Sequence, residues 1–160
     1  MKILLIQGPN INMLGRREPH IYGHMSMQSI HEQLNLAAKD AGAQIECFQS
    51  NFEGEIVDKI QESIESEIDG LIINPAAFTH SSLAIRDALA CLEIPSIEIH
   101  ISNLARREKE RQISVTAQAV TGVISGFGPF GYHIALMSLL QMIAQIRAQN
   151  EAINAQNQAN

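Results

Sequence analysis

Residues 15 to 25, GRREPHIYGHM, place Tyr22 after the arginine pair Arg16 and Arg17 and next to a glycine. A free phenol has a pKa near ~10 and is a poor base at neutral pH, but an adjacent guanidinium stabilises the phenolate. Lowering that pKa by ~2 units corresponds to ~2.7 kcal/mol of differential interaction. Because glycines suit a loop that closes over a ligand, the stretch predicts a tyrosine base. On these residues alone, a structural tyrosine is an equal alternative.

A second pair of candidates, Glu98 and His100, stands at the end of a short apolar run. Residues two apart in a strand share a face, so the carboxylate and the imidazole would lie together. A carboxylate beside an imidazole favours the protonated ring and fixes its tautomer, as a general acid requires. An edge salt bridge is the alternative interpretation.

Other kinds of chemistry lack their motifs. The segment GPNINMLG is neither GxGxxG nor GxxxxGK[ST], the six histidines form no HExxH pattern, and none of the lysines is placed for a Schiff base. We therefore expect no catalytic metal, no dinucleotide or P-loop nucleotide, and no Schiff-base lysine. Cys47 and Cys91 show no paired spacing, and we interpret them as reduced thiols in the core.

Composition points to a small-molecule partner. The net charge is −6 and no basic aromatic cluster is present, so a nucleic-acid surface is not expected. Apolar runs stay well short of the ~20 residues of a membrane span, and the N-terminal run breaks too early for a signal peptide. We expect no membrane partner and a cytoplasmic location.

Hydrophobic periodicity and turn residues predict alternating strands and helices. The expected strands are Lys2 to Gln7, Ala43 to Gln49, Gly70 to Ile73, Ser96 to Ile99 and Val120 to Gly126. The expected helices are Ser26 to Ala41, Glu53 to Ile68, Ser81 to Cys91 and Gly131 to Ile146, with a polar loop and a turn of helix over Ser102 to Gln112.

Five buried strands joined by helical crossovers specify an α/β fold, a parallel sheet covered on both faces. The usual strand order is 2-1-3-4-5, and ligands settle beyond the carboxyl ends of the strands where the order reverses. This nominates Asn10, Asn74, His80 and the residues from Glu98 to Ser102. We expect one domain over residues 1–147 and a polar, frayed tail over residues 148–160.

Five segments together resemble type II 3-dehydroquinate dehydratase across about residues 1 to 145: GPNINMLGRREPHIYG, FQSNFEGEIVDKI, INPAAFTHSSLAIRDAL, IEIHISN and GVISGFGPFGYHIAL. The resemblance implies a flavodoxin-like three-layer sandwich and a homo-oligomer, a dodecamer built as a tetramer of trimers. It also implies a cofactor-free lyase of the shikimate pathway that converts 3-dehydroquinate to 3-dehydroshikimate by anti elimination through an enolate.

The resemblance also implies residue roles. Tyr22 would be the base and Arg17 its activator, while His100 would be the acid, oriented by Glu98. Asn10 would hold a water at the enolate oxygen. Substrate contacts would come from Asn74, the backbone amides of Ile101 and Ser102, His80, Arg111, and Asp87 of an adjacent subunit. The alternative from another class is a non-catalytic binding module for a small polyhydroxy acid.

Overall fold

The computed structural model describes residues 1–16 and 25–158. Its strands are β1 (Lys2–Gln7), β2 (Gln44–Gln49), β3 (Gly70–Asn74), β4 (Ser96–His100) and β5 (Gly122–Ser125). Its α-helices over the described ranges are α2 (Met27–Asp40), α3 (Glu53–Ile64), α4 (Leu83–Ala90) and α5 (Phe130–Gln158). The strands form one parallel sheet in the order β2-β1-β3-β4-β5, which confirms the predicted class and strand order.

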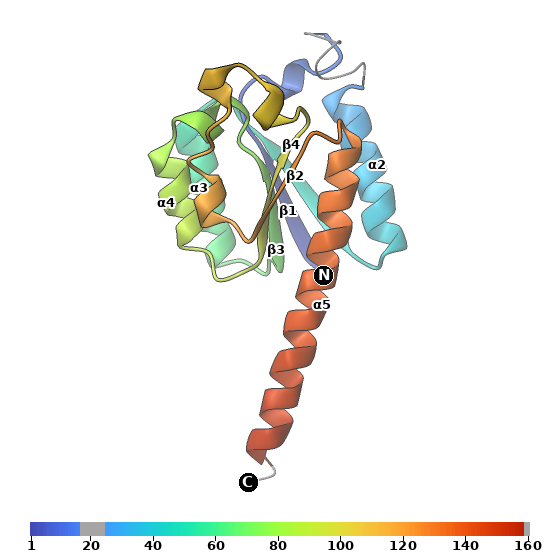
Figure 1. Ribbon diagram of the computed structural model, residues 1–160. Coiled ribbons are helices and arrows are strands. Elements are labelled where there is room, and N and C mark those ends of the chain that lie inside the picture. Colours follow the sequence, from blue (N-terminus) through green and yellow to red (C-terminus); the bar gives the residue numbers. More distant parts are fainter. Residues whose placement is uncertain (17–24, 159–160) are drawn as a thin grey trace.

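Helices cover both faces of the sheet, with α2 and α5 on one side and α3 and α4 on the other (Figure 1). Side chains alternate between the two cores along each strand: Ile3 and Leu5 of β1 pack with α2 and α5, while Leu4 and Ile6 pack with α3 and α4. All four are at most 1% exposed. Burying a side chain of this size contributes ~1.5–3 kcal/mol, so the central strands hold the layers together.

On β4, unlike on β1, the alternation of side chains places polar residues on one face of the sheet. Ile97 and Ile99 enter the core beneath α2 and α5, so Glu98 and His100 project to the opposite side of the sheet. Both polar side chains are buried there. The prediction that they share a face is confirmed.

Helix boundaries follow local chemistry. Ser26 caps α2 by accepting a hydrogen bond from the Ser29 amide, and Ser82 caps α4 by accepting one from the Ile85 amide. Helix α3 ends at Ile64, four residues earlier than expected. Near its end the Ser63 hydroxyl donates to the Ile60 carbonyl, a local bond of the kind that competes with helix continuation.

The last helix is longer than predicted. Helix α5 continues to Gln158 and projects past the sheet (Figure 1), so the expectation of a frayed tail is wrong for its backbone. Residues 144–157 are all exposed, and this stretch is rich in Ala and Gln with neither Gly nor Pro. Arg147 pairs with Asp69, and good helix formers without a stop signal extend the helix beyond this contact although the residues there are exposed.

One further expectation, that both cysteines lie in the core, is settled by the described residues. Cys47 is partly buried and Cys91 is exposed, so the placement of Cys91 in the core is wrong, although neither thiol is paired. No helix within the described ranges is both long and apolar enough to cross a membrane. The domain boundary at residue 147 stays a prediction.

Candidate active site

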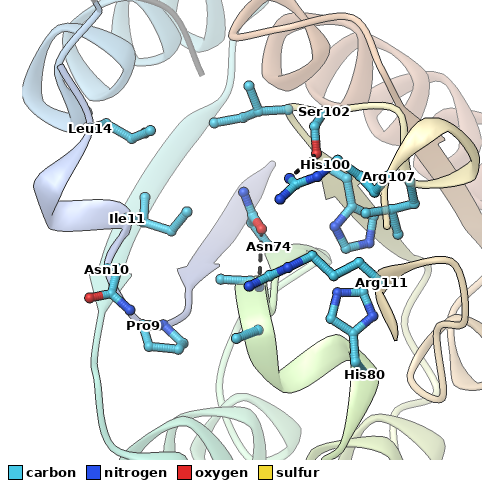
Figure 2. Close-up of a pocket in the computed structure, with 14 residues that line it drawn as sticks. Pro9, Asn10, Ile11, Leu14, Asn74, His80, His100, Ser102, Arg107 and Arg111 are labelled. Carbon is cyan, nitrogen blue, oxygen red and sulfur yellow. Dashed lines mark hydrogen bonds between the residues drawn. The ribbon is translucent and has the colours of Figure 1, made fainter. Parts of the chain in front are cut away.

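A pocket of about 130 Å³ opens at the carboxyl ends of β1, β3 and β4 (Figure 2). This is the edge at which the strand order reverses, as the sequence predicted. Its described lining consists of Pro9, Asn10, Ile11, Leu14, Asn74, Ala76, Ala77, His80, His100, Ile101, Ser102, Leu104, Arg107 and Arg111. Seven residues nominated from the sequence therefore meet in one cavity: Asn10, Asn74, His80, His100, Ile101, Ser102 and Arg111.

The loops after β1 and β3 are held together at one wall of this pocket. The Gly8 amide donates to the Asn74 carbonyl at 2.8 Å. A Cβ added at Gly8 would lie 2.3 Å from the Pro75 carbonyl oxygen, so only glycine allows this approach. The loop then brings Asn10 to the rim, with φ of 65°, in the left-handed region that asparagine tolerates better than most residues.

Asn74 ends β3 and is 3% exposed. Its Oδ1 accepts from the Ala76 amide at 3.1 Å, and its Nδ2 donates to the Tyr132 hydroxyl at 2.7 Å. Ala76 has a φ of 53°, an unfavourable conformation for alanine that these contacts help to hold. The Asn74 amide is consequently fixed where it faces the pocket.

Glu98 is fully buried behind the pocket and accepts hydrogen bonds at both carboxylate oxygens. Its Oε1 accepts from His100 Nε2 at 2.6 Å and from the hydroxyls of Thr79 and Ser114 at 2.9 Å. Its Oε2 accepts from the Thr116 hydroxyl. Burial opposes ionisation, yet the bonds from His100, Thr116 and Thr79 outweigh burial and lower the pKa of this carboxyl. A carboxylate therefore stands beside the imidazole.

The His100 ring is held in one orientation by this carboxylate. The ring is buried at 4% exposure, and because an ionised carboxylate only accepts, Nε2 carries a hydrogen. Nδ1 makes no hydrogen bond to another described residue, so it is the nitrogen left for proton transfer. The backbone amides of Ile101 and Ser102 follow at the end of β4 and likewise donate to no described residue, which leaves them for an anionic ligand.

Polar side chains reach the pocket from short 3-10 turns: His80 ends the turn after β3, and Arg107 and Arg111 lie in the segment after β4. His80 donates from Nδ1 to the Ile113 carbonyl at 2.7 Å, leaving Nε2 as its other polar atom. Arg111 is paired with Glu108 at 2.7 Å and is labelled among the pocket side chains in Figure 2. Arg107 donates to the Ser102 hydroxyl at 3.2 Å. The hydrogen bond from Arg107 is the main reason that the pKa of Glu108 falls to about 2.

Sequence reasoning missed two parts of the site. Arg107 was not nominated, although its four-residue spacing from Arg111 is a signal that both could face one ligand. The hydroxyls of Thr79, Ser114 and Thr116 converge on Glu98 from segments far apart in the chain, and no local pattern signals them.

Four nominated residues do not line the described pocket, and one of them, Glu98, is buried behind it. Arg17 and Tyr22 lie outside the described residues. Asp87 is on α4, 67% exposed, and its carboxylate pairs with Arg86 at 2.7 Å. It does not line the pocket of its own chain.

The described lining contains arginine and histidine side chains but neither aspartate nor glutamate. A chain with a net charge of −6 thus places two arginines, and no carboxylate, in the described lining of this pocket, which favours an anionic ligand. Among the described residues, no group of His, Cys, Asp and Glu is arranged to hold a metal ion.

Known proteins share this sequence and this structure. A family model described as dehydroquinase class II matches residues 1–140. The 3-dehydroquinate dehydratase of Aliarcobacter butzleri is 58% identical over 159 residues, covering 99% of this chain and 96% of the relative. That of Campylobacter lari is 59% identical over 160 residues, covering 100% and 99%. The crystal structure of type II dehydroquinase from Butyrivibrio crossotus has a TM-score of 0.86 and 49% identity, covering 87% of this chain and 97% of that one.

Proposed function

The chain belongs to the class II dehydroquinase family and is a hydro-lyase, and we propose that it removes water from 3-dehydroquinate by anti elimination through an enolate. The observation that carries this proposal is the Glu98–His100 pair at the floor of a cationic pocket. A proton donor there suits a reaction in which hydroxide must leave as water. The alternative of a non-catalytic binding module is set aside by the family.

The first step is removal of a proton from carbon. Tyr22, activated by Arg17, takes the C2 proton next to the C3 ketone of the substrate. The electrons of the C–H bond form the enolate, whose charge rests on the C3 oxygen. Asn10, at the rim of the pocket, holds a water against that oxygen. This assignment rests on the resemblance of residues 8–23 to the family motif.

The second step is loss of the C1 hydroxyl. The enolate reforms the ketone, a C1–C2 double bond forms, and the C–O bond breaks as His100 delivers a proton to the leaving oxygen. His100 transfers it from Nδ1, because Nε2 is bound to Glu98. The Glu98 carboxylate stabilises the positive ring before transfer and keeps its orientation. No cofactor or metal takes part in either step.

Substrate binding uses groups that can still form further hydrogen bonds. The Asn74 side chain and the backbone amides of Ile101 and Ser102 bind the substrate carboxylate and the neighbouring hydroxyl. His80 and Arg111 bind the ring hydroxyls, and both side chains are labelled at the same side of the pocket in Figure 2.

We assign the enzyme to the shikimate pathway in the cytoplasm, and to a homododecamer arranged as a tetramer of trimers. In this assembly Asp87 reaches the site of an adjacent subunit. Its exposure on α4, away from the pocket of its own chain, supports that role.

A direct test follows the ultraviolet absorbance of the conjugated enone product after 3-dehydroquinate is added. We expect absorbance to grow with wild-type protein. We expect Tyr22→Phe to lose nearly all turnover while the ligand still raises its Tm, because the base is lost but the binding groups remain. A Tyr22→Phe variant with unchanged turnover would refute the assignment of the base.

A further inference from the structure

Behind Asn74, a series of hydrogen-bonded polar side chains, of which only His31 is not fully buried, links the pocket to helix α2. The Tyr132 hydroxyl accepts from Asn74 Nδ2 at 2.7 Å and from Gln7 Nε2 at 3.0 Å. Gln7 Oε1 in turn lies 2.6 Å from His31 Nε2. These residues come from β3, α5, β1 and α2, so the series joins four elements of the fold.

Tyr132 is the largest buried side chain of the described core and is 1% exposed. Burial raises the pKa of its phenol to about 12, so the group stays a neutral hydroxyl. A hydroxyl oxygen has two lone pairs, and the amides of Gln7 and Asn74 occupy both. Tyr132 does not line the pocket itself, so any effect on a ligand must pass through Asn74.

His31, at the end of the hydrogen-bonded series that is farthest from the pocket, orients Gln7. A carboxamide oxygen only accepts, so His31 Nε2 must donate to Gln7 Oε1. Burial lowers the pKa of His31, which favours the neutral ring. With its oxygen held by His31, Gln7 turns its amide nitrogen toward Tyr132.

The inner end orients Asn74. One Nδ2 hydrogen goes to Tyr132 and Oδ1 accepts from the Ala76 amide, which leaves the second Nδ2 hydrogen for a ligand. Turning this amide over would bring its NH₂ group against the Ala76 N–H and remove the donor that faces Tyr132. We propose that Tyr132, supported by Gln7, is a positioning residue that fixes the Asn74 amide with its nitrogen available to the substrate. This inference rests on the proposed substrate contact of Asn74.

The test is Tyr132→Phe, which removes the hydroxyl and keeps the ring. Losing one partner of a buried hydrogen bond leaves the Asn74 amide free to turn, so we expect KM for 3-dehydroquinate to rise about tenfold, equivalent to ~1.4 kcal/mol. We expect kcat to stay within about twofold, because the contact of Asn74 with the substrate carboxylate is made equally in the ground state and in the transition state. Gln7→Met, which removes only the support, should raise KM about two- to threefold.

A matched control separates positioning from general loss of stability. Ser63→Ala also removes a buried hydroxyl, whose bond to the Ile60 carbonyl lies within α3 and away from the pocket. It should lower Tm and leave KM unchanged. The same KM rise in this control would overturn the proposal.

A double variant tests whether Tyr132 affects substrate binding through Asn74. If Tyr132 acts through Asn74, then Tyr132→Phe with Asn74→Ala has the same KM as Asn74→Ala alone; KM effects that multiply would overturn this. If Asn74→Ala raises KM but Tyr132→Phe does not, positioning fails while the binding role stands. If Asn74→Ala leaves KM unchanged, its proposed binding role fails, and positioning with it. If Tyr132→Phe does not fold, Gln7→Met replaces it, and its KM is compared alone and in combination with Asn74→Ala.

Discussion

Replacing Glu98 by glutamine keeps the shape of the side chain and removes its charge. Glu98 accepts from His100 at 2.6 Å, and a hydrogen bond to a charged partner contributes ~1.5–3 kcal/mol. If that stabilisation acts on the ring that delivers the proton, each ~1.36 kcal/mol lost slows the reaction tenfold. We therefore expect kcat of Glu98→Gln to fall about 10- to 150-fold. KM should change little, because Glu98 does not line the pocket.

The assay follows enone absorbance under saturating and limiting 3-dehydroquinate. Glu67→Gln is the matched control, because Glu67 is an exposed carboxylate paired with Lys2, which begins β1 at the opposite end from the pocket. It should leave kcat and KM unchanged. A Glu98→Gln variant whose kcat stays within about twofold of wild type would refute the claim that the carboxylate supports proton donation.

The same substitution predicts how stability depends on pH. Hydrogen bonds hold the pKa of Glu98 in the folded protein below its value in the unfolded chain, ~4.3. Its stabilisation is therefore fully present above that pH and is lost as pH falls through the folded pKa. We expect Glu98→Gln to melt at a lower temperature than wild type at pH 7, and the difference to shrink as the pH falls below ~4. A difference in Tm that grows on acidification would contradict the assigned direction.

Three further outcomes are expected. Thr116→Val deletes a hydroxyl that donates to Glu98 and should lower Tm by about 3–10 °C and kcat severalfold, whereas Thr116→Ser should stay near wild type. Gly8→Ala places a Cβ 2.3 Å from the Pro75 oxygen and should lower Tm and raise KM. Gly54→Ala, with open space around its Cβ in α3, should do neither; equal melting losses would contradict the contact argument. EDTA should leave kcat unchanged, and activity restored only by added metal would contradict the metal-free mechanism.

The fold was largely predictable because its central strands are buried on both faces. Runs such as residues 3–6 of β1 are uniformly apolar, and such runs joined by helices permit few arrangements. Strand ends were harder to predict. Strands β3 and β4 each continue one residue past the prediction, to Asn74 and His100, because a polar residue that ends a strand resembles the start of a loop.

The candidate site was predictable where residues follow a strand directly. Asn10, Asn74 and His100 needed only the strand order to be brought together. Side chains delivered by irregular segments were not predictable in this way. Whether Arg107 or Arg106 turns inward depends on a 3-10 turn over Leu104–Arg106, and adjacent arginines carry no signal to distinguish them.

The hydrogen-bonded series behind Asn74 is a further case. Gln7 ends an apolar strand and Tyr132 lies in the first turn of α5, so each is consistent with a simple packing role when considered alone. Only the folded chain brings them within 3.0 Å of each other. The C-terminal helix was missed for a different reason. Its last residues have no apolar face, and this was interpreted as the absence of a helix.

The most direct measurement concerns the fate of one hydrogen. We would prepare 3-dehydroquinate with deuterium only at the C2 position that lies anti to the C1 hydroxyl, and determine the mass of the 3-dehydroshikimate formed. Anti elimination predicts complete loss of deuterium, with a slower rate than for unlabelled substrate if breaking the C–H bond limits turnover. Product that retains the deuterium would mean that the other C2 hydrogen is removed, and would contradict the proposed mechanism.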